Sequence, residues 1–224
     1  GWAEKTDLLT LAPEAESVSF WEKPVQPIAM GSLAVWFDPN ELANGQFFFV
    51  KRSVYESTGG NESVKDKVVE DIEFAKRVRR SGFKTKFSDG TRLYRTRMYT
   101  SLSGIITGWT RILTHLFKKN IWKLFEKIGM FLIFSIAPFL ILATEIVFSL
   151  MGSAHFSKPI FWFSVAVSGL ITAIRIVGNK MLKCNPWYSF LHPLGSLVMV
   201  WILLLCVGRV IGGRPSVWKG ENYT

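Results

Sequence analysis

The stretch "IGMFLIFSIAPFLILATEIVFSLM", residues 128–151, decides the fold class of this chain. It is about as long as a helix that crosses a bilayer, which needs roughly 20 apolar residues. Two similar stretches follow, "PIFWFSVAVSGLITAIRIVG" (159–178) and "PLGSLVMVWILLLCVGRVI" (193–211). Core helices of a globular protein would need three such runs with almost no polar face. The sequence therefore predicts three transmembrane helices.

Lysine and arginine placement predicts their orientation. Cations cluster before the first stretch and in the second link, whereas the first link holds Lys158 alone. The clustered cations are Arg111, Lys118, Lys119, Lys123 and Lys127, then Arg175, Lys180 and Lys183. Because cations concentrate on the cytoplasmic side, the order is inside, outside, inside, with residues 1–127 in the cytoplasm of a plasma membrane, or an inner membrane if bacterial.

The polar tail, residues 212–224, would then lie on the far side. Cations at Arg209, Arg214 and Lys219 leave open a tail on the cytoplasmic face, with one hydrophobic stretch re-entrant.

Composition excludes several classes of protein. A net charge of +10 with 49% hydrophobic residues does not fit an ordinary soluble domain. Cys184 lies in a polar link and Cys206 within the third stretch, so a disulfide between them is not expected. The histidines His115, His155 and His192 lack metal-ligand spacing, which argues against a zinc site.

Residues 1–100 alternate strand-like and helical patterns, as in part of a mixed α/β domain. "GQFFFVKR" (45–52) predicts a buried strand. Ser53 and Glu56 then have capping-box spacing, and Gly59 and Gly60 can end the short helix in a left-handed conformation.

The segment "VVEDIEFAKRVRRSGF" (68–83) predicts an amphipathic helix of about four turns. Apolar residues recur at helical spacing and Gly82 is a suitable end. "FKTKFSD" (83–89) alternates polar and apolar residues and predicts a strand.

Residues 101–127 combine apolar and aromatic residues with cations. They predict an amphipathic segment in the membrane interface, and the alternative is a soluble helix docked on the domain. The chain also begins at Gly1, without methionine or signal peptide, in what resembles the middle of a domain. We therefore expect an N-terminal part to be missing.

A basic cluster follows the acids Glu70 and Asp71. Cations crowd into residues 76–97, where Asp89 is the only acid, so repulsion is expected unless an anion binds. Lipid headgroups, nucleic acid and a nucleotide diphosphate are three such anions. Nucleic acid is disfavoured because no binding motif accompanies the charge. On pattern alone, the acidic pair itself fits complementation of the helix dipole.

Several motifs together resemble a known family. They are "NGQFFFVKRSVYESTGGNESVKDKVVEDIEFAKRVRRSGFKTKFSDG" (44–90), "RTRMY" (95–99), "GW" (108–109), "SFWEKPVQP" (19–27) and "VWKGENY" (217–223). In this order they resemble the C-terminal half of a membrane-anchored family 2 glycosyltransferase of the hopanoid-associated and carotenoid type, related to ceramide glucosyltransferases. The resemblance covers nearly the whole chain.

The resemblance implies a partial GT-A nucleotide-sugar-binding domain in the cytoplasm, a divalent cation (Mg²⁺ or Mn²⁺) and inversion at the sugar carbon. It makes Asp71 the general base, with Glu70 beside it. The donor would be a nucleotide sugar and the acceptor a membrane lipid. The Asp-X-Asp metal motif of the family is absent from this chain. The fragment is therefore not expected to be active alone.

The family's arginine motif has only an approximate counterpart. Arg97 is the preferred diphosphate ligand, Arg95 is second and Arg92 is a further candidate. On a strand Arg95 and Arg97 would share a face, whereas on a helix Arg92 and Arg95 would. The closing motif of the family commonly has Arg where this chain has Glu221.

Asn44, Gly45 and Gln46 occupy the place where related enzymes bring the chain near donor and acceptor. Gly45 would permit a close approach of the backbone, and the alternative is an ordinary turn before a strand. In the first hydrophobic stretch Glu145 is expected to be protonated or water-exposed near the outer boundary.

The leading hypothesis is an inverting glycosyltransferase with a nucleotide-sugar donor and a membrane-lipid acceptor. The competing hypotheses are a non-catalytic basic membrane anchor or scaffold, and a fragment of a processive polysaccharide synthase. A synthase would predict more transmembrane helices and a clear glutamine-led arginine motif.

Overall fold

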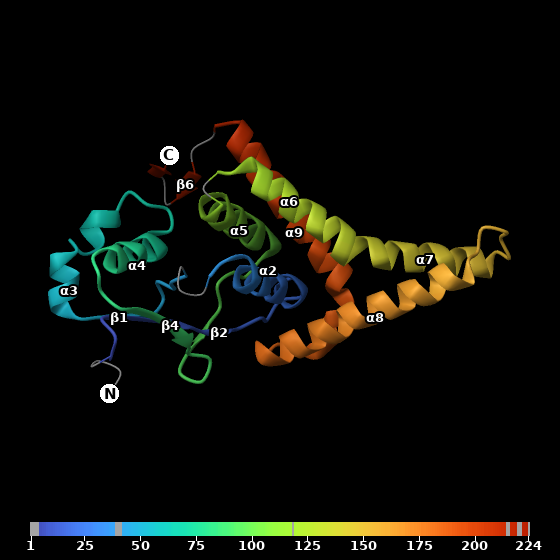
Figure 1. Ribbon diagram of the computed structural model, residues 1–224, viewed down its shortest axis with the longest axis horizontal. Helices are drawn as coiled ribbons and strands as arrows, with labels where there is room; N and C mark the ends of the chain where they lie inside the picture. The colour runs from blue at the N-terminus through green and yellow to red at the C-terminus, as the bar shows by residue number, and fades with distance from the viewer. Residues whose placement is uncertain (1–4, 39–41, 118, 214–215, 219–220, 224) are drawn as a thin grey trace. The chain divides into compact units, whose positions relative to one another are not determined.

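The computed structural model describes residues 5–38, 42–117, 119–213, 216–218 and 221–223. The chain is mostly helical with a small mixed sheet (Figure 1). It divides into two compact units. Unit 1 comprises Gly1–Glu16, Gly31–Met98 and Gly213–Thr224, and unit 2 comprises Ser17–Met30 and Tyr99–Gly212.

Unit 1 is built on a three-stranded sheet in the order β3-β1-β4. The central strand β1 (Leu8–Ala12) pairs antiparallel with β3 (Phe48–Val50) and parallel with β4 (Thr85–Asp89). Two short pairs complete the strands: β2 (Glu14–Ala15) is parallel to β5 (Arg95–Thr96), and β6 (Ser216–Trp218) is antiparallel to β7 (Glu221–Tyr223). The predicted strands near residues 45–52 and 83–89 are confirmed in shortened form as β3 and β4, but the prediction that the first is buried is wrong, because β3 lies at the sheet edge and Phe49 is 54% exposed.

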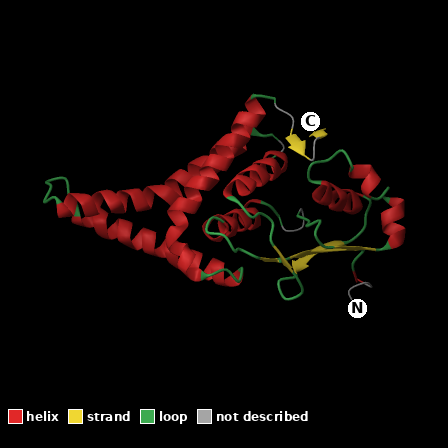
Figure 2. Cartoon of the chain, turned by 180° about the vertical axis from the view of Figure 1, so that it is seen from behind, coloured by secondary structure: helices red, strands yellow, loops and turns green. Residues whose placement is uncertain are grey.

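The core of unit 1 lies between the sheet and α4 (Glu70–Arg80), which covers one face (Figure 2). Leu8 of the central strand packs with Phe74, Ala75 and Val78 of α4. The predicted helix at 68–83 is thus confirmed, because apolar residues at this spacing have a sheet face to cover. Gly82, just after the helix, has φ +87°, a conformation that suits glycine.

Two shorter helices precede α4, namely α3 (Arg52–Ser57) and η2 (Asn61–Val64). The predicted capping box is wrong: α3 begins two residues earlier than an N-cap at Ser53 requires, Lys51 is at the N-cap position, and no side chain caps the helix. Glu56 instead pairs with Arg52, with 2.7 Å between Oε1 and Nε. Gly59 and Gly60 do adopt positive φ, at 81° and 53°.

Unit 2 contains three helices long and apolar enough to cross a membrane, which confirms that part of the predicted fold class. The first span, Ile121–Leu150, joins α6 (Ile121–Phe131), the π-helical segment η3 (Leu132–Ile136) and α7 (Ala137–Leu150). The second is α8 (Lys158–Met181). The third joins η4 (Pro186–Leu191) and α9 (His192–Ile211).

The first span starts seven residues before the predicted position 128. Asn120 caps it, since its side-chain Oδ1 accepts the Lys123 N–H at 3.2 Å. No helix breaker separates residues 121 and 128, so the cations there lie on the same helix and do not end it. Trp122 and Phe125, assigned above to the interfacial segment, are exposed on this span.

The amphipathic helix α5 (Leu102–Leu116) packs against α9, so its apolar face contacts protein. Trp109 is 2% exposed, and its Nε1–H donates to Oε1 of Gln26 at 2.7 Å. Gln26 belongs to the first half of α2 (Glu22–Trp36), whose residues 22–30 are part of unit 2. The units divide between Met98 and Tyr99, and residues 17–30 also belong to unit 2.

Glu145 on α7 is not water-exposed. It is 6% exposed, and its Oε2 accepts the N–H of Ser157 at 2.9 Å. Ser157 is the N-cap of α8, where backbone N–H groups lack partners within the helix. A carboxylate at this position complements the N-terminus of α8, a role that the expectation above omitted.

Candidate functional site

Asp71 lies in the first turn of α4 at the edge of the unit 1 core. The N-cap residue Val69 offers no side-chain cap to this helix. Asp71 supplies an acceptor instead, because its Oδ1 takes the N–H of Ile72 at 2.8 Å. Its neighbours on α4 are buried at positions 72, 74 and 75, whereas Asp71 is only half-buried. The carboxylate is thus fixed by the helix and still reachable from solvent.

Gly45 holds the other carboxylate oxygen. Its N–H donates to Asp71 Oδ2 at 2.9 Å across 26 positions of sequence. A Cβ at Gly45 would lie 3.2 Å from Asp71 Cβ and 3.4 Å from Oδ2. The predicted close approach of the backbone at Gly45 therefore exists, and the group approached is Asp71.

Burial raises the pKa of the Asp71 carboxyl above its ordinary value, and the negative charge of Glu70 adds to the effect. The N–H groups of Gly45 and Ile72 act in the opposite direction because they stabilise the ionised form. Glu70 itself is exposed. A half-buried carboxylate with a raised pKa is a stronger base than an ordinary surface aspartate.

The loop that carries Gly45 is anchored to the end of β1. Asn44 N–H donates to Thr10 Oγ1 at 2.8 Å, and Thr10 Oγ1 donates to Asn44 O at 3.0 Å. The Asn44 side-chain amide also donates to Leu11 O at 3.2 Å. These bonds fix the backbone N–H of Gly45 before any ligand binds.

Gln46, a predicted binding residue, is exposed next to this loop. Its N–H donates to Asn44 Oδ1 at 3.2 Å, and its Oε1 accepts from Asn44 Nδ2 at 3.4 Å. The structure thus brings Asn44, Gly45 and Gln46 together with Asp71.

Tyr94 is a member of the site that the sequence analysis missed. Its hydroxyl donates to Leu11 O at 2.7 Å and accepts from Asn44 Nδ2 at 3.4 Å. Its ring lies against Phe47, with 5.8 Å between centroids. Burial raises the pKa of Tyr94, so the hydroxyl remains a donor at neutral pH. No sequence signal marks it, since the contact spans 50 positions.

The three predicted arginines lie near Tyr94 in sequence and are exposed. Arg95 lies on the two-residue strand β5, whereas Arg92 lies in a turn before it and Arg97 directly after it. The Nε of Arg95 pairs with Glu14 Oε1 of β2 at 3.0 Å, and the Arg95 side chain is still 71% exposed. Within the described ranges, no hydrogen bond or ion pair joins Arg92 or Arg95 to Asp71.

The basic cluster is less repulsive than its sequence suggests. Arg77 Nε donates to the carbonyl of Thr58 at 2.6 Å, and Arg79 Nε donates to Thr85 Oγ1 at 3.1 Å. Lys76 pairs with Glu73 at 3.0 Å. These three cations have partners within unit 1, so repulsion alone is not an argument for a bound anion.

Within the described ranges, no three His, Cys, Asp or Glu side chains come together as ligands for a metal ion. Asp71 already accepts the backbone N–H groups of Gly45 and Ile72. These residues alone therefore do not fit the Mg²⁺ or Mn²⁺ site that the resemblance implies.

The chain matches no family model, no curated protein and no solved structure.

Proposed function

We propose that this chain is the acceptor-side part of an inverting glycosyltransferase that transfers a sugar from a nucleotide donor to a hydroxyl or carboxyl group of a membrane lipid. The observation that carries the proposal is the half-buried Asp71 carboxylate, which has a raised pKa and is held by the Gly45 N–H at 2.9 Å. The motif order that resembles family 2 glycosyltransferases supports the same conclusion.

Asp71 would act as the general base. A sugar-accepting hydroxyl holds its proton too tightly to react at neutral pH, so a base must take the proton as the new bond forms. In this step the acceptor oxygen bonds to the anomeric carbon, and the bond from that carbon to the diphosphate oxygen breaks. The electron pair leaves with the nucleoside diphosphate, and the proton moves to Asp71.

The geometry of Asp71 suits this role. A carboxylate has about four acceptor positions, and the two N–H groups occupy two of them. The remaining positions can accept a proton from an acceptor hydroxyl. Gly45 and the anchored Asn44 loop limit rotation of the carboxylate, so orienting it costs little at the moment of reaction.

The leaving diphosphate needs positive charge. Arg97 is the preferred ligand, with Arg95 and Arg92 next, because a planar guanidinium matches phosphate oxygens in two places at once. All three are exposed on the segment around β5. Breaking the surface pair between Arg95 and Glu14 would cost about 1 kcal/mol or less, so Arg95 can change partner.

Three apolar spans support a lipid as the acceptor, since they keep the chain in the bilayer where such an acceptor is found. The distribution of lysine and arginine supports a cytoplasmic catalytic unit, where nucleotide sugars are available. The nucleobase of the donor and the implied divalent cation would be bound outside this chain, the cation by an Asp-X-Asp segment.

The test is an assay of the natural protein in its own membranes with radiolabelled nucleotide sugars and a lipid extract. We expect label to enter a lipid product with inverted configuration at the sugar carbon, and Asp71→Asn to abolish the transfer. An anchor or scaffold would give no labelled lipid with any nucleotide sugar. A processive synthase would give a polymer in place of a lipid with one sugar.

A further inference from the structure

A polar stripe runs along the membrane-spanning helix α8. Ser164, Ser168, Thr172, Arg175 and Asn179 are spaced by three or four residues and so lie on one helix face. Ser164, Ser168 and Asn179 are at most 4% exposed. Polar side chains within a membrane are costly and mark functional positions more often than chance.

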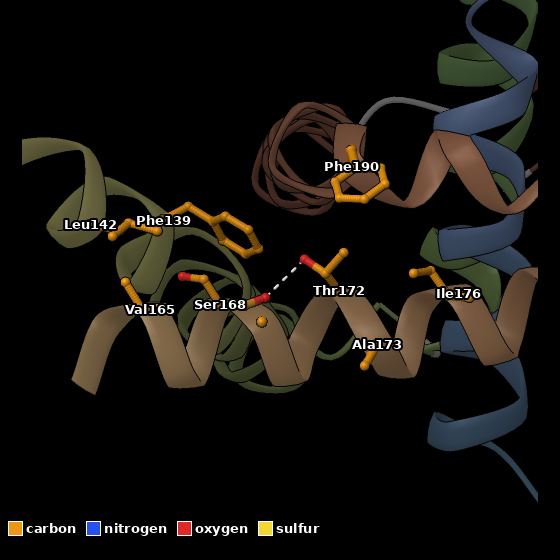
Figure 3. A pocket seen from close by; sticks show the side chains of 9 residues that line it. Phe139, Leu142, Val165, Ser168, Thr172, Ala173, Ile176 and Phe190 are labelled. Carbon is orange, nitrogen blue, oxygen red and sulfur yellow. Dashed lines mark hydrogen bonds between the residues drawn. The ribbon is translucent and has the colours of Figure 1, made fainter. Parts of the chain in front are cut away.

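A groove of about 440 Å³ follows this stripe between α8, α7 and η4. Phe139 of α7 and Phe190 of η4 face Ser168 and Thr172 across it (Figure 3). Its lining is otherwise apolar, as with Val165. The volume falls within the range of ligand pockets, roughly 300 to 1,000 Å³. Within a bilayer, an open apolar groove on a membrane-spanning helix is in contact with the hydrocarbon chains of lipids.

The Ser168 hydroxyl is the first observation that favours a ligand in this groove over imperfect helix packing. The side chain is 4% exposed and lines the groove, but its Oγ has no hydrogen-bond partner among the described residues. Thr172, by contrast, satisfies its hydroxyl by donating to the Ser168 carbonyl at 2.8 Å. Simple helix packing would leave no reason for an unpartnered hydroxyl at this position.

Arg175 does not line the groove itself, but it follows the lining residue Thr172 by three positions and so lies about one turn further along the same face of α8. Its Nη2 donates to Asn179 Oδ1 at 3.3 Å, and Asn179 Nδ2 donates to Ser189 Oγ at 3.0 Å. Its Nε is buried without a partner, and no acid pairs with Arg175 within the described ranges. The guanidinium therefore carries an uncompensated charge and free donors.

The depth of Arg175 suits a headgroup. It precedes the end of α8 by six residues, about 9 Å along the helix axis. Lys180 lies further toward the same end, where cations meet the membrane surface. Ordinary snorkelling would place the whole guanidinium in water, whereas here Asn179 and the burial of Nε hold it against the protein.

We propose that this groove binds one hydrocarbon chain of an acidic membrane lipid, and that Arg175 binds its phosphate. The lipid phosphate accepts from the Nη groups of Arg175, because Nε is buried, and a guanidinium pairs well with phosphate oxygens. Binding requires no sugar transfer, so the proposal stands or falls independently of the function proposed above.

The experiment is photo-crosslinking of the full chain in nanodiscs. The probes are phosphatidic acid and phosphatidylcholine with identical diazirine-bearing acyl chains. We expect phosphatidic acid to crosslink to peptides of α7, α8 and η4, and Arg175→Gln to lower its yield about tenfold, as for loss of a charge-assisted contact. Arg175→Lys should keep part of the yield. The matched control is Arg209→Gln, in the last turn of α9.

A second pair of variants tests the groove itself. Gly169 lines it, and no atom lies within 4 Å of a Cβ built at this position, so Gly169→Phe directs a ring into the groove from an open position. We expect that variant to lose crosslinking. Gly178→Phe is its control, because Gly178 also has no atom within 4 Å and does not line the groove.

Equal yields from both lipids, or an undiminished yield in Arg175→Gln, would overturn the assignment of Arg175. An undiminished yield in Gly169→Phe would overturn the groove as the chain-binding site. Displacement of the lipid by excess inorganic phosphate would show a simple anion site, which also contradicts the proposal. Circular dichroism of each variant verifies that the helices are intact.

Discussion

Replacement of Asp71 by asparagine removes a proton acceptor with little change in shape. The amide oxygen can still accept one of the two N–H groups that the carboxylate accepts now, from Gly45 or Ile72. The other N–H loses its acceptor, a cost of about 1–3 kcal/mol where it is buried. Loss of a general base lowers a rate by about 10²–10⁴-fold. We expect sugar transfer to fall by that factor while donor binding persists.

The pH profile gives a second, independent measure. The base must be ionised, so transfer is lost as the pH falls through the pKa of Asp71, which lies above the ordinary value of 3.8. The charge of Glu70 contributes to that raised pKa. Glu70→Gln should therefore lower the pKa of Asp71 and move the acid limb of the profile to lower pH.

Initial rates with labelled nucleotide sugar, measured in membranes that contain the natural protein, test both expectations. Glu73→Gln is the control, because Glu73 lies in the same first turn and pairs with Lys76 on the surface. A near-normal rate in Asp71→Asn would remove Asp71 from the mechanism. An acid limb that does not move in Glu70→Gln would refute the electrostatic coupling of the two acids.

Four further predictions follow from the same structure. Gly45→Ala places a Cβ 3.2 Å from Asp71 Cβ, so the carboxylate must shift and the transfer rate should fall, by less than in Asp71→Asn. Arg97→Ala should raise the inhibition constant of the nucleoside diphosphate product about tenfold, and unchanged product inhibition would contradict its role. A cysteine at position 158, in a background without native cysteines, should react with an impermeant reagent from the outer side only. Trp109→Phe removes the buried indole N–H bond and should lower the free energy of unfolding by about 1–3 kcal/mol, whereas Trp122→Phe, at a 79% exposed position, should not.

The spans and α4 could be predicted because their signals are local. A run of about 20 apolar residues or an amphipathic period depends only on neighbouring positions. The start of the first span at Ile121 was missed, because lysines on an exposed helix face look like a boundary in sequence. The grouping of residues 17–30 with unit 2 was also missed. It depends on pairs such as Trp109 and Gln26, which are 83 positions apart.

The candidate site shows the same limit. Asp71 and Gly45 were each predicted as site residues. No sequence pattern indicates that the Gly45 N–H donates to the Asp71 carboxylate. The contact between Tyr94 and Asn44 could not be predicted, because a side-chain contact across 50 positions produces no periodic pattern in the sequence. Arg95 was predicted as a phosphate ligand. Its ion pair with Glu14 was not predicted, because it depends on the pairing of β2 with β5, and strands of two residues have no recognisable sequence pattern.

The π-helical segment Leu132–Ile136 has a consequence for the register of the first span. It precedes Pro138, which cannot donate a backbone hydrogen bond, and the wider turn absorbs one extra residue. Before it α6 contacts α9, and after it α7 contacts α8. Because the wider turn takes up one residue, deleting a single residue there should restore regular winding and leave the face of α7 toward α8 unchanged. Deleting a residue from the regular part of α7 before Glu145 would instead rotate Glu145 by about 100° and separate it from Ser157.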